Sequence, residues 1–406
     1  MKLFYFGSVC SQSIFNETVS KSKVKPSASA QNFEYALLKG FSKNQNVELN
    51  VVSAESIATF PKGNRLILRK RQDVLAENLF AQIVPALNLP IFKQKNHANG
   101  VYKRLLKWLK ENREESEKAV LVYGLYPPVV KKIKRACMQY HCKVFAIITD
   151  IPKTMFTYTK SSFLKKLFGK KYRESAIRLQ NTFDGYIYLT EAMHEEVAPE
   201  KPYTVVETIA DTNIFDEMKC VEKATPTALM YAGALYEKYG VDKIIQVFEC
   251  METDTQLWIF GSGDYEERIK EKQKENPKIR FFGRVDRETV LQKEMEASLL
   301  LNIRNPRNEY TKYSFPSKMV EYMLSGTPLV TTRLEGIPKE YEPYVFYLDY
   351  DEPKIMAKQI DFILEGKQEY NLQFGKNAST FVKSEKNCVT QAEKIFNFIK
   401  REVKKG

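Results

Sequence analysis

A short stretch in the second half of the chain carries side chains suited to a charged, hydroxyl-bearing ligand. Residues 300–332 read LLNIRNPRNEYTKYSFPSKMVEYMLSGTPLVTT, an apolar strand followed by a polar loop and a helix. Lys318 and Glu321 stand three residues apart at the start of that helix, so both lie on one face of it. Cations beside a helix start attract an anion such as a phosphate, and a carboxylate one turn further on can accept two hydrogen bonds from a ribose diol. The polar loop adds four charged residues, Arg304, Arg307, Glu309 and Lys312.

Proline, serine and glycine residues mark the limits of this helix. Pro316 suits a first turn, and Ser317 is expected to cap it. Gly326 ends the helix, and Pro328 begins the next strand. The alternative to an anion site is a surface ion pair between Lys318 and Glu321, with the arginines of the loop in solvent.

Two glycine-containing turns follow strands earlier in the second half. Gly233 stands in AGALYEKYG, where Lys238 adds a positive charge, and Gly261 opens GSGD. A glycine turn that leads into a helix brings backbone N–H groups close to a phosphate. The second turn lacks the third glycine of a dinucleotide fingerprint, and neither turn has the Lys-Ser or Lys-Thr pair of a P-loop. A tight turn without a ligand is the alternative for both.

These loops need strands and helices to position them, and the sequence alternates between the two. Short runs rich in Val, Ile and Phe predict strands at 2–6, 47–52, 119–123, 143–148, 185–189, 228–231, 256–260, 278–282, 298–302 and 328–331. Helical patterns lie between them, at 32–41, 238–251, 264–274, 286–296 and 316–325. Such alternation is typical of parallel β/α units, whose ligands bind beyond the carboxyl ends of the strands.

The length of 406 residues exceeds one core at roughly 100–200 residues per domain. The pattern of strands and helices restarts after a stretch of mixed polarity at about 202–226. We therefore predict an α/β protein with two Rossmann-like, doubly wound domains facing a cleft, at residues 1–205 and 206–385. Residues 386–406 form an amphipathic helix, with its apolar face at Val389, Ala392, Ile395, Phe396, Ile399 and Val403, and we expect it to pack back on the first domain.

Taken in order, these motifs resemble family 4 of the retaining glycosyltransferases, which have the two-domain GT-B arrangement. The resemblance covers about 230–332. Residues 230–245 look like the family's first loop and helix of the nucleotide-binding domain, 257–263 like its Phe-Gly-x-Gly turn, and 280–285 like the segment that holds the nucleobase. Residues 315–330 look like the Pro-Ser-Lys-x-x-Glu-Tyr-Met motif that is frequent in capsule and exopolysaccharide transferases.

The resemblance implies roles for these residues. Glu321 would bind the ribose hydroxyls of a nucleotide-sugar, and Lys318, Arg304 and Lys238 would surround its diphosphate. The wider donor site would include Gly233, Gly261, Arg284, Val285 and Ser317. Lys318, Arg304, Glu309 and Lys312 are the catalytic candidates, and Gly7 and Asp150 the acceptor candidates in the first domain.

The implied chemistry uses no cofactor and no metal. The nucleotide-sugar is a substrate, and nearby lysines and arginines stabilise the charge that builds on its leaving group. A metal-dependent transferase would use an Asp-x-Asp pair. Asp349 and Asp351 have that spacing, but they follow the nucleotide motifs in an expected surface loop.

The chain also departs from the family pattern at four positions. Ala234, Tyr239, Tyr313 and Thr149 stand where many members carry Arg, Lys, Glu and His. Two alternatives therefore stay open. One is a nucleotide-sugar epimerase of the same fold, and the other is a degenerate, non-catalytic partner of a true transferase.

The excess of positive over negative charge in the chain lies entirely in its first half. The net charge is +13, and residues 1–200 hold 32 Lys and Arg against 17 Asp and Glu. The segments YKRLLKWLK at 102–110 and SFLKKLFGKKY at 162–172 resemble basic amphipathic segments on anionic bilayers. We expect Trp108, Lys165, Lys166, Lys170 and Lys171 to face the membrane. The alternative is that the apolar residues face the domain core.

The sequence therefore predicts a nucleotide-sugar-dependent hexosyltransferase of surface polysaccharide biosynthesis. It would transfer a sugar with retention to a saccharide acceptor, predicted to be lipid-linked. No stretch approaches the ~20 apolar residues of a membrane-spanning helix, and the start of the chain is too briefly apolar for a signal peptide. We expect a cytoplasmic protein bound peripherally to the inner face of the plasma membrane, with no nucleic-acid partner, since no recognised binding module accompanies the charge.

Overall fold

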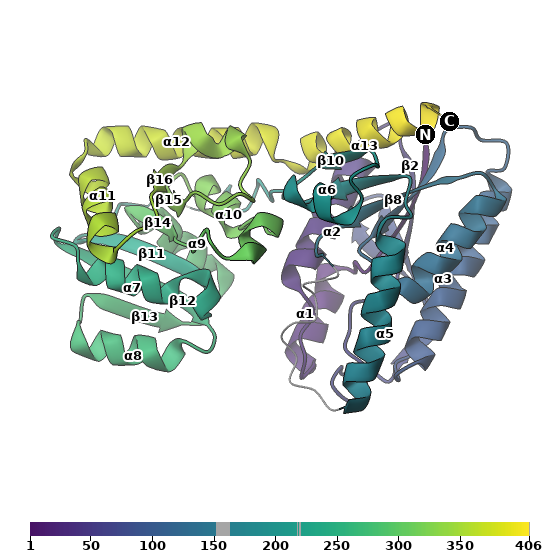
Figure 1. Ribbon diagram of the computed structural model, residues 1–406, viewed down its shortest axis with the longest axis horizontal. Coiled ribbons are helices and arrows are strands. Elements are labelled where there is room, and N and C mark those ends of the chain that lie inside the picture. The colour runs from purple at the N-terminus through teal and green to yellow at the C-terminus, as the bar shows by residue number, and fades with distance from the viewer. Residues whose placement is uncertain (152–162, 217, 219–220, 406) are drawn as a thin grey trace. The chain divides into compact units, whose positions relative to one another are not determined.

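The computed structural model describes residues 1–151, 163–216, 218 and 221–405, with side chains left undescribed at 163–168. The chain forms two compact α/β units (Figure 1), of which the first comprises residues 1–209 and 388–406 and the second comprises residues 210–387. Both sheets are dominated by parallel strands. The predicted class, two doubly wound α/β domains, is confirmed.

Unit 1 contains an eight-stranded sheet in the order β10-β9-β8-β7-β1-β2-β5-β4. Its strands are β1 (Lys2–Gly7), β2 (Glu48–Ser53), β4 (Arg71–Ala76), β5 (Leu79–Ile83), β7 (Lys118–Tyr123), β8 (Lys143–Ile148), β9 (Gly185–Tyr188) and β10 (Tyr203–Val205). All pairs are parallel except β4 with β5, and the short strands β3 (Ile67–Leu68) and β6 (Ala86–Leu87) form a separate antiparallel pair. The central strands are continuous apolar runs because helices cover both faces of the sheet.

Two helices distant in sequence cover one face of this sheet. Helix α2 (Ala28–Ser42) contributes Phe33, Leu37 and Phe41 to a core shared with α13 (Cys388–Lys404). Figure 1 shows the two chain ends side by side, where Lys404 near the C-terminus pairs at 3.4 Å with Glu117, just before β7. The C-terminal helix therefore packs on the first unit, as predicted. Val389, expected on its apolar face, is instead exposed.

The other face is covered by α3 (Phe92–Glu111) and α4 (Pro127–Gln139). Trp108 of α3 is only 5% exposed, and its ring lies 5.5 Å from that of Phe4 in β1. The expected membrane-facing position of Trp108 is therefore wrong. The apolar side of segment 102–110 forms the domain core, and its exposed lysines form the solvated side.

Unit 2 contains a six-stranded, all-parallel sheet in the order β13-β12-β11-β14-β15-β16. Its strands are β11 (Thr227–Ala234), β12 (Thr255–Ser262), β13 (Ile279–Gly283), β14 (Leu299–Asn302), β15 (Leu329–Thr332) and β16 (Phe346–Leu348). Its helices are α7 (Val241–Glu249), α8 (Glu266–Glu275), α9 (Arg287–Glu296), α10 (Lys318–Leu324), α11 (Pro353–Glu365) and α12 (Gln368–Glu385). Helices α10 and α12 share a core on one face, and α7, α8 and α11 share one on the other.

No helix among the described residues is both long and apolar enough to cross a membrane.

Candidate functional site

The two predicted glycine turns of unit 2 lie side by side at the ends of β11 and β12. Gly233 is paired with Gly261 in the parallel ladder, and Leu235 N–H donates to the Ser262 carbonyl at 3.0 Å. Gly261 has a φ of +133°, and a Cβ there would lie 1.8 Å from the Gly233 carbonyl oxygen. Only glycine fits this contact. Both glycines are half-buried, and the turns that follow them present backbone that an extended anion can approach.

Helix α10 is fastened to the end of β11 by a buried tyrosine. The Tyr322 hydroxyl accepts from Ala232 N–H at 2.6 Å and donates to the Ala232 carbonyl at 3.0 Å. Tyr322 is 1% exposed, so these bonds replace those that water would make. They hold helix α10, which carries the neighbouring Glu321, against the end of β11 just before Gly233.

Lys318 and Glu321 form an ion pair, which was the alternative to an anion site, but the pair is half-buried and the structure adds a third member from α9. The Lys318 ammonium contacts Glu321 and lies 2.8 Å from the carboxylate of Glu294, while Arg287 lies 3.6 Å from Glu321. The cluster is thus two carboxylates bridged by one ammonium, with a guanidinium on its outer side.

Burial acts differently on the three central groups. It raises the pKa of the Glu294 carboxyl to about 8, with Lys318 opposing the shift. At Glu321 burial is outweighed by Lys318 and Arg287, which hold the pKa of that carboxyl below its usual value. At Lys318 burial is outweighed by the two carboxylates, which raise the pKa of the ammonium. Glu321 is therefore the ionised acid near neutral pH, an acceptor of hydrogen bonds with no proton of its own.

The structure also brings together Arg304 and Lys238, from loops after different strands. The guanidinium of Arg304 and the ammonium of Lys238 lie 4.9 and 5.0 Å from the centre of the Tyr239 ring. Gly240 makes this approach feasible, since its φ is +80° and a Cβ there would lie 1.8 Å from the Ile303 carbonyl oxygen. The Arg304 Nε also donates to Asn302 at 3.1 Å. Two cations predicted to flank a diphosphate therefore share one aromatic platform.

The other predicted residues of unit 2 have varied surroundings. Glu309 and Lys312 lie exposed in the 3-10 turn Glu309–Tyr313, where Lys312 is 3.4 Å from Glu335. Ser317 makes no side-chain capping bond, so the predicted cap is wrong; its backbone is already helical. Arg284 is exposed, and Val285 packs on the core beneath.

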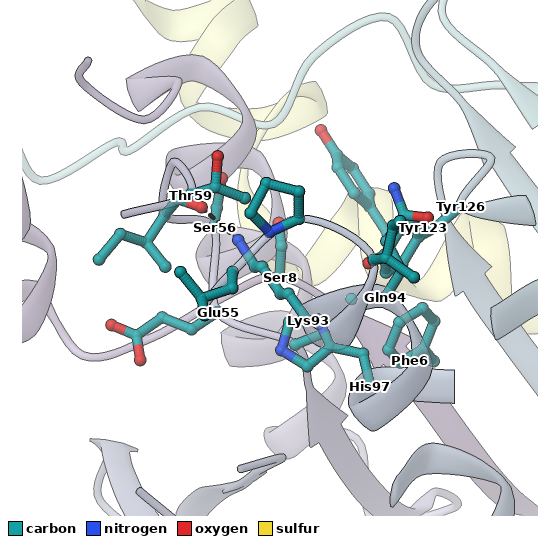
Figure 2. Close-up of a pocket in the computed structure, with 16 residues that line it drawn as sticks. Phe6, Ser8, Glu55, Ser56, Thr59, Lys93, Gln94, His97, Tyr123 and Tyr126 are labelled. Atoms are coloured by element: carbon teal, nitrogen blue, oxygen red, sulfur yellow. Dashed lines mark hydrogen bonds between the residues drawn. The ribbon is translucent and has the colours of Figure 1, made fainter. Parts of the chain in front are cut away.

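Unit 1 has a cavity of about 370 Å³ where β1, β2 and β7 end (Figure 2). Its wall includes the predicted Gly7, together with Ser8, Glu55, Lys93, His97, Tyr123 and Tyr126. Asp150, the other acceptor candidate, is exposed at the end of β8 and accepts from the Thr149 hydroxyl at 3.2 Å; it does not line this cavity.

A buried carboxyl holds the loop after β1 in place. Glu34 of α2 accepts from Ser8 N–H at 2.9 Å, from the Ser8 hydroxyl at 2.6 Å and from the Tyr5 hydroxyl at 2.8 Å. A Cβ on Gly7 would lie 1.7 Å from a Glu34 oxygen, so the loop closes over the carboxyl only because residue 7 is glycine. Burial raises the pKa of Glu34 to about 7, against the pull of these donors.

The four lysines predicted to face a membrane belong to α5 (Phe163–Gln180). Lys170 and Lys171 are exposed. The side chains of Lys165 and Lys166 lie outside the described residues.

Sequence reasoning missed several residues of these sites. Glu294 stands in the polar segment RETVLQKEME, which reads as a solvated helix. Lys93 and His97 stand four residues apart on α3, and this spacing was the one sign in the sequence that they share a face of the helix. Nothing in the sequence pointed to Glu34.

Residues 215–381 match the family model described as glycosyl transferases group 1. This match confirms the predicted enzyme class, a glycosyltransferase. No curated protein matches the chain in sequence.

Solved structures resemble the whole chain. Anabaena HepE in complex with UDP is 13% identical, with 99% of this chain and 100% of that chain covered and a TM-score of 0.60. Sucrose-phosphate synthase from Thermosynechococcus elongatus is 13% identical, with 100% of both chains covered and a TM-score of 0.61. The lipopolysaccharide outer core galactosyltransferase WaaB is 12% identical, with 98% of this chain and 99% of that chain covered and a TM-score of 0.60. At these identities the likeness shows the fold, which is GT-B. Membership of family 4, retention and a role in capsule synthesis stay predictions.

Proposed function

We propose that this protein transfers a hexose from a nucleotide-diphosphate-sugar to a lipid-linked saccharide during surface polysaccharide biosynthesis, with retention of configuration. The observation that carries the proposal is the ionised Glu321, held by Lys318 and by the Tyr322 anchor beside the glycine turns of β11 and β12. A carboxylate beside a backbone edge and a pair of cations suits a ribose diol joined to a diphosphate.

In the proposed donor complex, Glu321 accepts both ribose hydroxyls, and Arg304 and Lys238 face the diphosphate. Breaking the glycosidic bond builds negative charge on the nucleoside diphosphate, and fixed cations stabilise that charge more in the transition state than in the ground state. Lys318 adds a further positive charge. Glu309 and Lys312, from the turn Glu309–Tyr313, are further catalytic candidates. Because side chains carry the compensating charge, the proposed reaction needs no metal and no cofactor.

The acceptor is proposed to bind unit 1, and retention to follow from its attack on the leaving-group side of the sugar. The excess positive charge of residues 1–200 and the exposed Lys170 and Lys171 support a peripheral contact with the inner face of the plasma membrane. HepE, which has been solved with UDP, UDP-glucose and glucose, makes UDP-sugars the first donors to test.

The test is isothermal titration calorimetry of the full chain with UDP and GDP, and then with their sugars. We expect Glu321→Ala to weaken nucleotide binding about ten-fold or more, since two hydrogen bonds to a charged group are lost. The matched control is Glu271→Ala, which removes an exposed glutamate of α8 and should change binding less than two-fold. Equal affinities for the two variants would refute the ribose assignment.

Two outcomes would favour the alternatives. Failure of the wild-type chain to bind any nucleotide would indicate a degenerate partner of a transferase. Formation of a new isomer of the nucleotide-sugar, with no acceptor present, would indicate an epimerase.

A further inference from the structure

The cavity of unit 1 lies where a ligand of a parallel sheet is expected, at the carboxyl ends of β1, β2 and β7. Its volume of about 370 Å³ falls within the range of small-molecule sites. The segment 54–59 after β2, the loop 89–91 and the first turns of α3 line it. A single monosaccharide fits such a space, so its wall chemistry bears on which sugar enters.

His97 presents an unsatisfied polar atom in this wall. Its side chain is 1% exposed, and its Nε2 has no hydrogen-bond partner among the described residues. Burial, with Lys93 nearby, lowers the pKa of this imidazole to about 3, so the ring is neutral. Buried polar atoms in folded proteins are nearly always bonded. A neutral imidazole nitrogen in a cavity wall is completed by a ligand hydroxyl, which can donate to it or accept from it.

Lys93 presents an uncompensated positive charge one helical turn away. Figure 2 shows its side chain beside His97 in the cavity. Its ammonium donates to the Ile57 carbonyl, yet it has no carboxylate within ion-pair distance in the described part of the chain. Burial lowers its pKa to about 8. Charged groups withdrawn from water are normally paired with an opposite charge. We therefore expect the ligand of this cavity to supply the negative charge that pairs with Lys93.

The nearest acidic wall residue, Glu55, is already neutralised. Its side chain is 1% exposed and pairs with two guanidiniums, with Arg65 and at 2.9 Å with Arg71. The two guanidiniums already exceed the charge of this one carboxylate, so Glu55 leaves the charge of Lys93 uncompensated. Tyr123 and Tyr126 add aromatic surface, with the Tyr126 ring edge-on to His97 at 6.2 Å. Aromatic faces pack against the C–H groups of a sugar ring, which a free inorganic anion does not have.

We propose that this cavity binds the acceptor through an anionic sugar, with its carboxylate or phosphate held by Lys93 and a hydroxyl of the same ring bonded to His97. The inference rests on the proposed function, because it names the class of acceptor that the transferase takes. The negative charge can come from a uronic acid or from a sugar phosphate. Each carries anionic oxygens on a ring that also bears hydroxyl groups.

The test is a ligand-observed NMR titration of the full chain with three sugar probes, and with inorganic phosphate as a competitor. They are the methyl glycosides of glucuronic acid, of glucose 6-phosphate and of glucose. We expect at least one anionic probe to bind about ten-fold or more tightly than the neutral one. The comparison between the two anionic probes tells which source of charge the cavity prefers.

Three variants of α3 make the result specific. Lys93→Met should abolish the preference for the anionic probe, whereas Lys95→Met, which removes an exposed lysine of the same helix, should retain it. His97→Phe should weaken binding of all three probes. Lys93→Met removes an unpaired charge from a half-buried site, so the thermal midpoint should not fall.

Three outcomes would overturn the proposal. They are equal binding of the neutral and anionic probes, an undiminished preference in Lys93→Met, and binding of inorganic phosphate as tight as that of the sugar phosphate. UDP binding to unit 2 is measured on the same samples. Its absence in the wild type would count against the proposed function, whereas its presence with any of the three outcomes would count against this inference alone.

Discussion

The ammonium of Lys318 lies 2.8 Å from the carboxylate of Glu294, a side chain with no exposed surface. Because Glu294 comes from α9 and Lys318 from α10, this contact joins two helices beneath the proposed ribose-binding residue, Glu321. It also means that Lys318 contacts the acidic groups of Glu294 and Glu321 at once. The energetics of the donor site therefore depend on a buried acid that does not face the ligand.

Replacement of Lys318 by Met should destabilise unit 2 in a pH-dependent manner. Without the ammonium, ionised Glu294 has no compensating charge, and breaking a buried pair in this way costs about 3 kcal/mol of unfolding free energy. The loss should be largest near pH 9 and smaller near pH 6, where protonation of Glu294 relieves it. Urea unfolding monitored at both pH values measures the difference.

The double variant Lys318→Met/Glu294→Gln is the decisive comparison. It removes both charges and should regain most of the stability lost by Lys318→Met. Lys312→Met is the control, since its pair with Glu335 is half-exposed and such pairs contribute about 0–1 kcal/mol. If the double variant were as unstable as Lys318→Met, the two side chains would not be coupled.

Gly261→Ala should disrupt the proposed phosphate edge. The added methyl would lie 1.8 Å from the Gly233 carbonyl oxygen at a backbone φ of +133°, so the two strand ends must separate. We expect a loss of about 3 kcal/mol in stability and loss of nucleotide binding by calorimetry. Gly169→Ala is the matched control. Among the described residues nothing lies within 4 Å of a Cβ at this helical glycine, so the change should stabilise the chain by about 0.5–1 kcal/mol.

The strands that position both sites were predictable from sequence because they are continuous apolar runs between helical patterns. The pattern fails at the edges of the sheets. Strands β4 and β5 alternate between buried and exposed residues, and β16 is only three residues long. None of the three strands therefore has a long apolar run. The Lys318–Glu321 pair was predictable for a local reason, since residues three apart in a helix always meet.

Contacts between distant segments were not predictable in the same way. Glu294 is one of several glutamates in a polar helix, and only the packing of α9 against α10 distinguishes it. The cavity of unit 1 is formed by four segments, 6–8, 54–59, 89–97 and 123–126, that only the fold brings together, so Lys93 and His97 read as two ordinary helix residues. The sequence alone did not decide whether Trp108 faces a bilayer or a core, because the helical period is the same in both.

The burial of Trp108 separates its role from membrane binding. Trp108→Ala should destabilise unit 1 by about 3–5 kcal/mol, because it removes a large ring packed against Phe4. Trp108→Phe should keep the fold and leave sedimentation with anionic vesicles unchanged. The paired substitution Lys170→Gln/Lys171→Gln should weaken that sedimentation about ten-fold or more, at about 1 kcal/mol per lysine. Weaker binding in Trp108→Phe but not in the lysine variant would reverse this assignment.

Glu34 should make the stability of unit 1 depend on pH. Its pKa is raised from 4.5 to about 7 in the folded chain, so the folded state holds a proton that the unfolded state has released over this range. Its contribution to stability is therefore fully present below about pH 4.5 and is lost as the pH rises through about 7. The loss is on the order of 3 kcal/mol.

Glu34→Gln, which keeps the shape and an acceptor for Ser8, should flatten the fall in thermal midpoint between pH 5 and pH 8. The exposed Glu48, replaced in the same way, should leave the wild-type slope unchanged. Equal slopes in the wild type and Glu34→Gln would show that Glu34 does not take up a proton in this range. Since the Ser8 loop lines the cavity, binding of the acceptor probes to Glu34→Gln should vary less with pH than binding to the wild type.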